Sequence, residues 1–344
     1  MNIGLLGFGV VGGGVWELAQ ENRALNVKKV LVRREAPPLG KAAVQDVEAI
    51  LRDTDIDTVV EVLGGLHPAY EWICRALAAG KDVVTANKAV ISAYYRELTA
   101  LAHENGAALR CTAAVGGGIP WLVNLQRCRR VDTVTEVGGI MNGTTNFIMD
   151  AMARQGADFP AVLQRAQELG YAEADPSADI DGDDIRRKLT ISANIAFDAL
   201  LREEDIPAFG IRTVTGADVA DFRAHGFTCK LLACAQRTET GVAAYVEPAL
   251  VAEGEPEAAV PGNYNLISCT GELLGRQSYF GRRTVSHGGQ CGAGLPGSAD
   301  RRGRLLHGDG PAHGGRGRCR GASLLCSHPS GGSVAGERHG GPVG

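Results

Sequence analysis

The sequence predicts an α/β fold in which a Rossmann-like, doubly wound parallel sheet is followed by a second domain of the α+β class. Three observations support this prediction. A glycine-rich turn at residues 7–12 lies between an apolar strand at residues 2–6 and a helix that runs to about residue 20, which is the setting in which such a turn binds a dinucleotide. Apolar runs then alternate with helical stretches, as is typical of a parallel sheet. Around residue 129 this alternation stops.

The first domain, residues 1–128, is built from that alternation. Its other predicted elements are strands at residues 27–32, 58–63 and 82–85 and helices at residues 69–79 and 94–104. In an open parallel sheet, ligands bind outside the carboxyl ends of the strands, so the functional residues of this domain are expected at that edge.

The second domain, residues 129–280, begins with a strand at residues 133–140, which leads through Asn142-Gly143-Thr144-Thr145-Asn146 into a helix. Its remaining predicted elements are helices near residues 161–169 and 184–201 and strands near residues 228–237 and 242–247. A mixed layer of this size can bind a substrate and form a homodimer, so we expect a substrate-binding and dimerisation domain.

Composition excludes several classes of protein. With 344 residues, of which 44% are hydrophobic and 22% charged, the chain is large enough for two domains with cores. The N-terminal stretch lacks a basic leader and turns glycine-rich, so we expect neither a signal peptide nor a membrane span, and we expect a cytoplasmic protein. We also expect no membrane partner and no nucleic-acid partner. The nine cysteines form no C-x-x-C pair, and we expect no disulfides and no zinc.

Residues 281–344 differ from the rest of the chain. They hold nine Arg, no Lys and three acidic residues, which gives a charge balance of +6 against −10 for residues 1–280. They also hold 19 glycines and no Phe, Tyr, Trp or Ile. Such a segment cannot build a core, so a disordered tail is expected.

The glycine-rich turn indicates a dinucleotide cofactor. Its first glycine permits the tight turn, its second lets the backbone approach a pyrophosphate, and its third packs the helix on the strand. Arg33 and Arg34 follow the second strand, where an acid would bind the ribose of NAD, so NADP is favoured unless the two arginines are only surface charges. The predicted cofactor contacts are Gly7, Gly9, Val10, Val11, Gly12, Arg33, Arg34, Gly64 and Lys88.

The segment most informative about chemistry is GYAEADPSADIDGDDIRRK at residues 170–188, where six carboxylates precede a lysine at the start of an apolar helix. Lys188 lies one helical turn after Asp184, so the two side chains can pair. A lysine held in this way can protonate a substrate oxygen and take the proton back, and we predict that Lys188 is the acid and base. A solvated acidic loop followed by an ordinary surface ion pair is the alternative.

Two further segments are expected near the ligand. Lys88 follows Thr85-Ala86-Asn87 at the end of a strand and is expected to face cofactor or substrate, with a solvated loop lysine as the alternative. Glycines dominate the run Val115-Gly116-Gly117-Gly118-Ile119-Pro120, so its amides and carbonyls are exposed to a ligand or ion. A flexible hinge between the two domains is the alternative.

Together these segments resemble the homoserine dehydrogenase family. The motifs that carry the resemblance follow the family's order over about residues 1–281: GFGVVG at 7–12, EVLGG at 61–65, TANKA at 85–89, AAVGGGIP at 113–120, GGIMNGTTNFI at 138–148 and GYAEADPSADIDGDD at 170–184. The resemblance implies NAD(P)-dependent interconversion of L-homoserine and L-aspartate 4-semialdehyde, in the pathway to threonine, methionine and isoleucine.

The resemblance also implies roles for single residues. Lys188 is the implied proton donor and acceptor, and Glu173 the implied partner of the substrate's amino group. The whole predicted substrate site consists of Tyr171, Glu173, Asp179, Asp184, Gly143 and Thr144. Family members also hold a structural sodium-like ion on backbone carbonyls, here those of Val115, Gly117 and Ile119, but the family's usual acid at the start of this motif is Thr112 in this chain.

Two other functions stay open. One is that of another Rossmann reductase of a small carbonyl compound, against which the acidic loop with Lys188 argues. The other is that of a non-catalytic, truncated or frameshifted homologue that binds nucleotide and dimerises. In family members the motif Gly-Ala-Gly-x-x-Pro-Thr-Ala begins at the position of Gly281. Reading the codons after Gly281 one base later gives Ala-Gly-Arg-Tyr-Pro-Thr-Ala with permissible wobble bases, which continues Gly281 as that motif. We therefore expect residues 281–344 to be out of frame, with a genuine basic tail as the alternative.

Overall fold

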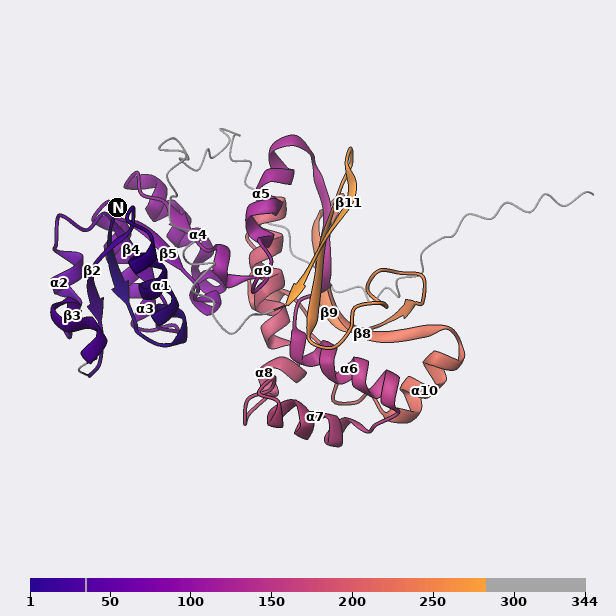
Figure 1. Cartoon of the computed structure of the whole chain (residues 1–344). Coiled ribbons are helices and arrows are strands. Elements are labelled where there is room, and N and C mark those ends of the chain that lie inside the picture. Colours follow the sequence, from indigo (N-terminus) through magenta and orange to yellow (C-terminus); the bar gives the residue numbers. More distant parts are fainter. Residues whose placement is uncertain (35, 283–344) are drawn as a thin grey trace, which may run out of the picture.

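The first domain is a six-stranded parallel sheet in the strand order β3-β2-β1-β4-β5-β6. It is seen in a computed structural model that describes residues 1–34 and 36–282 of the chain (Figure 1). Its strands are β1 (Asn2–Leu6), β2 (Asn26–Leu31), β3 (Ala43–Val44), β4 (Thr58–Glu61), β5 (Asp82–Thr85) and β6 (Leu109–Arg110). The order reverses between β1 and β4, which confirms the predicted doubly wound sheet. In folds of this kind, dinucleotides bind at such a reversal.

Helices cover both faces of this sheet. They are α1 (Val10–Glu21), α2 (Glu48–Leu51), α3 (Ala69–Ala78) and α4 (Lys88–Glu104), with short 3-10 helices η1 (Pro37–Ala42) and η2 (Thr112–Ala114). Alternate strand residues divide between the two faces. Leu5 and Val60 pack with Val15 of α1, whereas Val59 packs with Ile73 of α3.

Helix α4 is longer than the predicted residues 94–104. It begins at Lys88, directly after β5, with Asn87 as its N-cap and a kink at Tyr94, whose φ is −128°. The β-branched Val90 and Ile91 obscure the helical pattern of its first turns in the sequence. Consequently Lys88 stands at the start of a helix at the carboxyl edge of the sheet.

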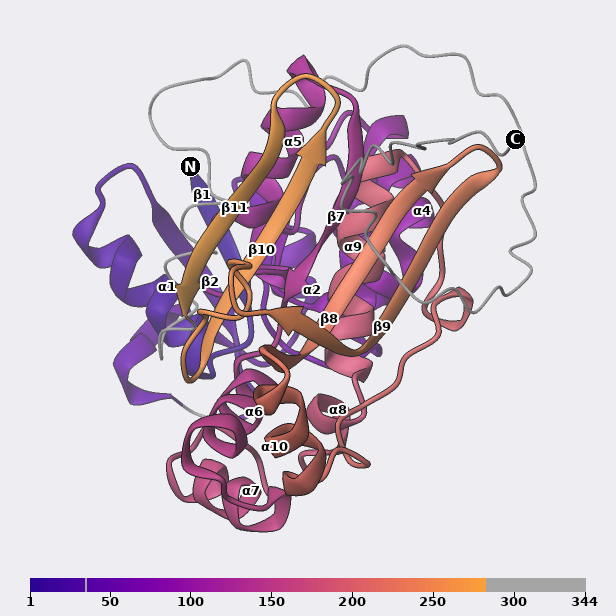
Figure 2. The same ribbon diagram turned by 90° about the vertical axis from the view of Figure 1, so that its right-hand side faces the viewer.

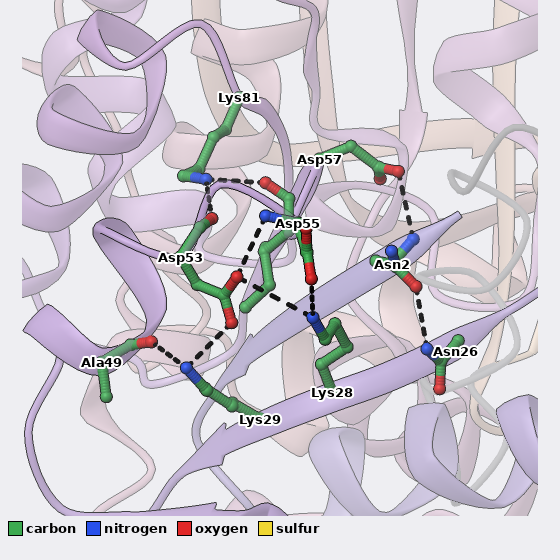
Figure 3. A network of polar contacts seen from close by, with 10 residues as sticks. Asn2, Asn26, Lys28, Lys29, Ala49, Asp53, Asp55, Asp57 and Lys81 are labelled. Carbon is green, nitrogen blue, oxygen red and sulfur yellow. Dashed lines mark hydrogen bonds and ion pairs between the residues drawn. The ribbon is translucent and has the colours of Figure 1, made fainter.

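The opposite, amino edge of the sheet carries an ionic network (Figure 3). Lys29 pairs with Asp53 at 2.8 Å, and Lys28 pairs with Asp55 at 2.8 Å. Lys81, only 7% exposed, donates to the backbone carbonyls of Asp53 and Ile56 at 2.7 and 2.6 Å. These contacts tie β2 and Lys81, the residue before β5, to the segment between α2 and β4, at the end of the sheet that faces away from the predicted cofactor site.

The second domain is a five-stranded antiparallel sheet in the order β11-β10-β7-β8-β9. Its strands are β7 (Val134–Ile140), β8 (Phe227–Thr238), β9 (Gly241–Ala252), β10 (Tyr264–Gly271) and β11 (Gly275–Arg282). Its helices are α5 (Trp121–Val131), α6 (Gly143–Gln155), α7 (Phe159–Glu168), α8 (Ser177–Ile180), α9 (Asp183–Phe197), η3 (Glu203–Asp205) and α10 (Gly216–Ala224). This architecture confirms the expected α+β domain.

The described helices of this domain leave one face of its sheet uncovered. Helix α9 packs against β7, β8 and β9, and α5 packs against α9 and β10. Figure 2 shows the strands β8 to β11 from the other side, where none of the described helices crosses them. Residue 128, the predicted domain boundary, lies within α5. Within the described residues, no helix combines the length and apolar character needed to span a membrane.

The hairpin of β10 and β11 corrects one prediction. Gly281 and Arg282, expected to open a disordered tail, belong to β11 and pair in antiparallel register with Asn265 and Tyr264 of β10. Backbone pairing therefore continues two residues into the segment of unusual composition. The rest of the predicted tail, residues 283–344, lies outside the described residues.

Candidate active site

The acidic segment leads into α9, the helix that carries the predicted acid and base. Gly182 takes a left-handed conformation with φ +89° and stands at the N-cap, so that the chain turns directly into the helix at Asp183. Asp184 lies in the first turn and Lys188 one turn later, on the same side. The ion pair predicted from this spacing is present, with Lys188 Nζ 2.6 Å from Asp184 Oδ2.

Asp184 is the centre of the site. Its carboxylate is 5% exposed and lies between two ammonium groups, because Lys88 Nζ of α4 is 2.5 Å from Oδ1. The Asn142 amide also donates to Oδ2 at 2.9 Å. Burial raises the pKa of Asp184, but the charges of Lys188 and Lys88 and their hydrogen bonds outweigh it, so the pKa lies below its ordinary value. Asp184 is therefore an anion that joins a lysine of the first domain to one of the second.

The ammonium group of Lys188 contacts two acceptors. Besides the ion pair, Nζ donates to the carbonyl oxygen of Met141 at 2.7 Å, and its side chain is 16% exposed. Ser192, one turn further along α9, accepts from the indole of buried Trp121 at 2.9 Å and donates to the Lys188 carbonyl at 2.8 Å. The helix that carries the lysine is thus tied to α5, and the described residues accept hydrogen bonds from two of the three N–H groups of its ammonium.

Asn142 connects the acids of the site, a role that the sequence alone did not predict. It is the N-cap of α6, with Oδ1 accepting from the backbone of Thr145 at 2.9 Å. Its amide donates to Asp179 at 2.7 Å as well as to Asp184. An asparagine between a strand and a glycine-started helix is a recognisable cap signal, but only the fold reveals that its other side meets the acidic segment.

Asp179 stands in a different environment from Asp184. Burial, and then repulsion from the Asp184 carboxylate, raises its pKa, while the hydrogen bond from Asn142 acts in the opposite direction. Two carboxylates held by one amide therefore have pKa values shifted in opposite directions, a pattern that is frequent in catalytic sites.

The start of α6 offers backbone donors beside these acids. A side chain at Gly143 would lie 2.6 Å from the carbonyl oxygen of Asn263, so only glycine fits there. Thr144 donates through Oγ1 to the Tyr171 carbonyl at 2.7 Å, which fixes the acidic loop against the helix. Glu173, in the same acidic loop, has an exposed side chain.

The turn between β1 and α1 is shaped for a dinucleotide. Gly7 has φ +106°, and a Cβ on Gly12 would lie 2.3 Å from the Gly7 carbonyl oxygen, so helix and turn approach too closely for any side chain. A Cβ on Gly9, the N-cap of α1, would meet none of the described residues within 4 Å. The space that the described residues leave at this helix N-terminus fits a pyrophosphate.

The other predicted cofactor residues lie around this turn. Arg33 and Arg34 are exposed after β2, and Gly64, with φ +78°, is exposed in the loop after β4. Val10, at the start of α1, is 70% exposed. The two arginines are accessible to a ligand at the carboxyl edge of the sheet.

The glycine run that the resemblance links to a cation forms a tight loop. Gly116 and Gly117 have φ of +97° and +60°, and the Ile119 carbonyl accepts from the backbone of Trp121 at 2.7 Å. The buried Oγ1 of Thr112 has no hydrogen-bond partner among the described residues. An unpartnered buried hydroxyl at the start of the loop fits an additional ligand there.

These features define a class of protein: an NAD(P)-dependent oxidoreductase with a Rossmann domain and a lysine paired with a buried carboxylate on a second domain. Comparison with known families is more specific. The family model described as homoserine dehydrogenase matches residues 120–290, and the model described as homoserine dehydrogenase, NAD binding domain, matches residues 7–112. The chain belongs to the homoserine dehydrogenase family, which acts on a CH–OH group.

Individual relatives agree with the family models. The homoserine dehydrogenase of Synechocystis sp. is 42% identical over 300 residues, which cover 82% of this chain and 69% of that protein. The crystal structure of a homoserine dehydrogenase from Thiobacillus denitrificans has a TM-score of 0.80 and 36% identity, covering 86% of this chain and 71% of that one. A hyperthermophilic archaeal homoserine dehydrogenase in complex with NADPH has a TM-score of 0.72 and 25% identity, covering 84% and 94%.

Proposed function

We propose that this homoserine dehydrogenase interconverts L-aspartate 4-semialdehyde and L-homoserine at the site between α4, α6 and α9, with NADP preferred over NAD. The observation that carries the proposal is the contact of Lys188 and Lys88 with one buried carboxylate, Asp184. It brings an acid–base pair of the second domain to the carboxyl edge of the cofactor sheet, where the chemistry must occur.

Lys188 is the proposed proton donor and acceptor. When bound, the nicotinamide cofactor supplies or accepts the hydride. Lys188 gives a proton to the aldehyde oxygen in the reductive direction and takes it back from the hydroxyl in the other. Asp184 keeps the ammonium in place and Lys88 shares the carboxylate, so that positive charge faces the oxygen on which negative charge develops.

The substrate is an amino acid, and the acidic loop and the start of α6 suit its two charged groups. The exposed carboxylate of Glu173 is free to bind the ammonium group. The backbone amides of Gly143 and Thr144 stand at a helix N-terminus, which favours a carboxylate. Asp179 and Tyr171 complete the proposed pocket. Asp179 accepts a hydrogen bond from Asn142, and the carbonyl oxygen of Tyr171 accepts one from Thr144.

NADP is favoured because Arg33 and Arg34 are exposed after β2, where a 2′-phosphate would be neutralised. We also propose that the carbonyls of Val115, Gly117 and Ile119 hold a structural monovalent cation. The unpartnered hydroxyl of Thr112 supports this second point.

A homodimer is proposed from the bare face of the second sheet (Figure 2). Leu231 and Ala233 of β8 belong to the core beneath the helices, so the alternate residues Leu232 and Cys234 face the opposite way. Phe280 of β11, 56% exposed, stacks on Tyr264 on that side. We place the protein in the cytoplasm, since no disulfide joins any of the six described cysteines. We also place it in the pathway to threonine, methionine and isoleucine.

Purified protein tests the function directly. Oxidation of NADPH and NADH is followed by absorbance with L-aspartate 4-semialdehyde as substrate, and a small unrelated aldehyde serves as control. We expect turnover only with the semialdehyde, and a higher kcat/KM for NADPH. Binding of NADPH without turnover would identify a non-catalytic homologue, and equal rates with the control aldehyde would identify another reductase.

A further inference from the structure

A fully buried carboxylate, that of Glu61, stands at the carboxyl end of β4, directly below the proposed site. Its exposure is 0%, and the described part of the chain offers it no lysine or arginine within ion-pair distance. The role proposed above for Lys88 and Lys188 does not use it. Removing a charge from water is costly, so a buried carboxylate must be compensated by hydrogen bonds.

The compensation comes from three donors on two segments. Glu61 Oε1 accepts from the backbone of Leu63 at 2.8 Å and from the Asn87 amide at 3.4 Å, and Oε2 accepts from the hydroxyl of Thr85 at 2.5 Å. A carboxylate satisfies donors at both oxygens. A glutamine, which has one acceptor oxygen and one NH₂ group, would point a donor at one of them.

The donor Asn87 connects the Glu61 carboxylate to the start of α4. Asn87 caps α4 by accepting from Val90, and its amide also donates to the Gly65 carbonyl at 2.7 Å. The next residue is Lys88, whose Nζ contacts Asp184. The carboxylate therefore sits between the loop after β4 and the first turn of α4.

The loop after β4 also meets the phosphate turn. The carbonyl oxygen of Val62 would lie 3.2 Å from a Cβ on Gly7, and the Val62 side chain 3.3 Å from a Cβ on Gly12. Glu61 thus fixes, through hydrogen bonds, both a wall of the dinucleotide turn and the helix start that aims Lys88.

We propose that Glu61 is a positioning residue that aligns Lys88 with Asp184 and couples this alignment to the loop beside the cofactor. The proposal rests on the function proposed above for Lys88. It assigns the carboxylate an action on turnover through Lys88, in contrast to a merely structural role in β4.

The test is a double-mutant cycle of Glu61→Gln and Lys88→Met, read as kcat, KM and the cofactor Kd. Glu61→Gln is expected to lower kcat at least tenfold and to leave the KM for the semialdehyde within about twofold. In the Lys88→Met background the same substitution is expected to change kcat less than twofold. Independent effects, in which the two losses multiply, would overturn the proposal, as would a normal kcat for Glu61→Gln.

Two variants keep the test interpretable. Glu257→Gln is the matched control, because Glu257 is also a buried glutamate but pairs with Arg276 in the second domain; its kcat is expected to stay at the parent value. Should Glu61→Gln fail to fold, Thr85→Val removes one donor to the same carboxylate and is expected to lower kcat in the same Lys88-dependent way. A normal kcat for Lys88→Met alone refutes the role of Lys88, and the role of Glu61 with it.

Discussion

Replacing Lys188 by methionine tests the site most directly. Methionine has nearly the length of the lysine side chain but no ammonium, so the packing of α9 is kept. Asp184 does not become an isolated buried charge, because Lys88 and the Asn142 amide still contact it. The substitution therefore separates the loss of proton transfer from the collapse of the site.

The magnitude follows from the contacts of the ammonium. Loss of a general acid and base lowers kcat by about 10²–10⁴, or roughly 3–5 kcal/mol of transition-state stabilisation. Loss of the donor to the Met141 carbonyl, 2.7 Å away, leaves a buried acceptor unsatisfied and lowers the free energy of unfolding by about 1–3 kcal/mol. The activity loss thus exceeds what partial unfolding of a stable domain produces.

The assay combines kcat, cofactor Kd by fluorescence titration and thermal unfolding. Lys81→Met is the matched control, since Lys81 is also a buried lysine that donates to backbone carbonyls but stands at the amino edge of the first sheet (Figure 3). Both variants should lose stability, and only Lys188→Met should lose turnover. A kcat of Lys188→Met within a few-fold of the parent value refutes the assignment.

Four further outcomes are expected. Replacing both Arg33 and Arg34 by glutamate should weaken NADPH far more than NADH; equal losses in binding titrations would leave them as surface charges. Asp179→Asn should raise Tm at neutral pH. Burial and the Asp184 carboxylate raise the pKa of Asp179, so the native state loses stability as the pH rises through that pKa, and asparagine removes this loss. The same substitution should raise the KM for the semialdehyde. An unchanged KM would remove it from the pocket. Burial lowers the pKa of Lys230 from 10.5 to about 8, so the free energy of unfolding should rise between these pH values by up to about 3 kcal/mol; urea titrations should show no such rise for Lys230→Met. Sequencing the gene around the Gly281 codon should reveal a one-base shift, and an intact frame giving a fully active enzyme would refute it.

Local patterns in the sequence were enough to predict the glycine turn and the main strands of the first domain. In the Gly7–Gly12 turn the helix approaches the strand closely. A Cβ on Gly12 would lie 2.3 Å from the Gly7 carbonyl oxygen, so this position requires glycine. The strands of a buried parallel sheet are short apolar runs, so β1, β4 and β5 were placed within two residues of their bounds. The i,i+4 spacing of Asp184 and Lys188 likewise fixed their pairing, because a helix turn alone brings them together.

The hairpin of β10 and β11 was not predicted, because its stability comes from strands elsewhere in the chain. Strand β11 reads Gly275-Arg276-Gln277-Ser278-Tyr279 at its start, which has little strand character of its own. It is held by β10, which in turn pairs with β7, more than a hundred residues away. Strand propensity depends on such neighbours more than on the residues themselves.

The sequence by itself determined the fold class, the cofactor turn and the one-turn spacing of Asp184 and Lys188, since each depends on residues close together in the chain. Only the tertiary structure decided that Lys88 meets Asp184, that Asn142 joins two carboxylates, and that Glu61 lies beneath the start of α4. Those contacts link positions between 26 and 96 residues apart. The periodicity of a helix or strand carries no information at that range, and the contacts exist because the buried faces of two sheets and their helices can pack in only one way.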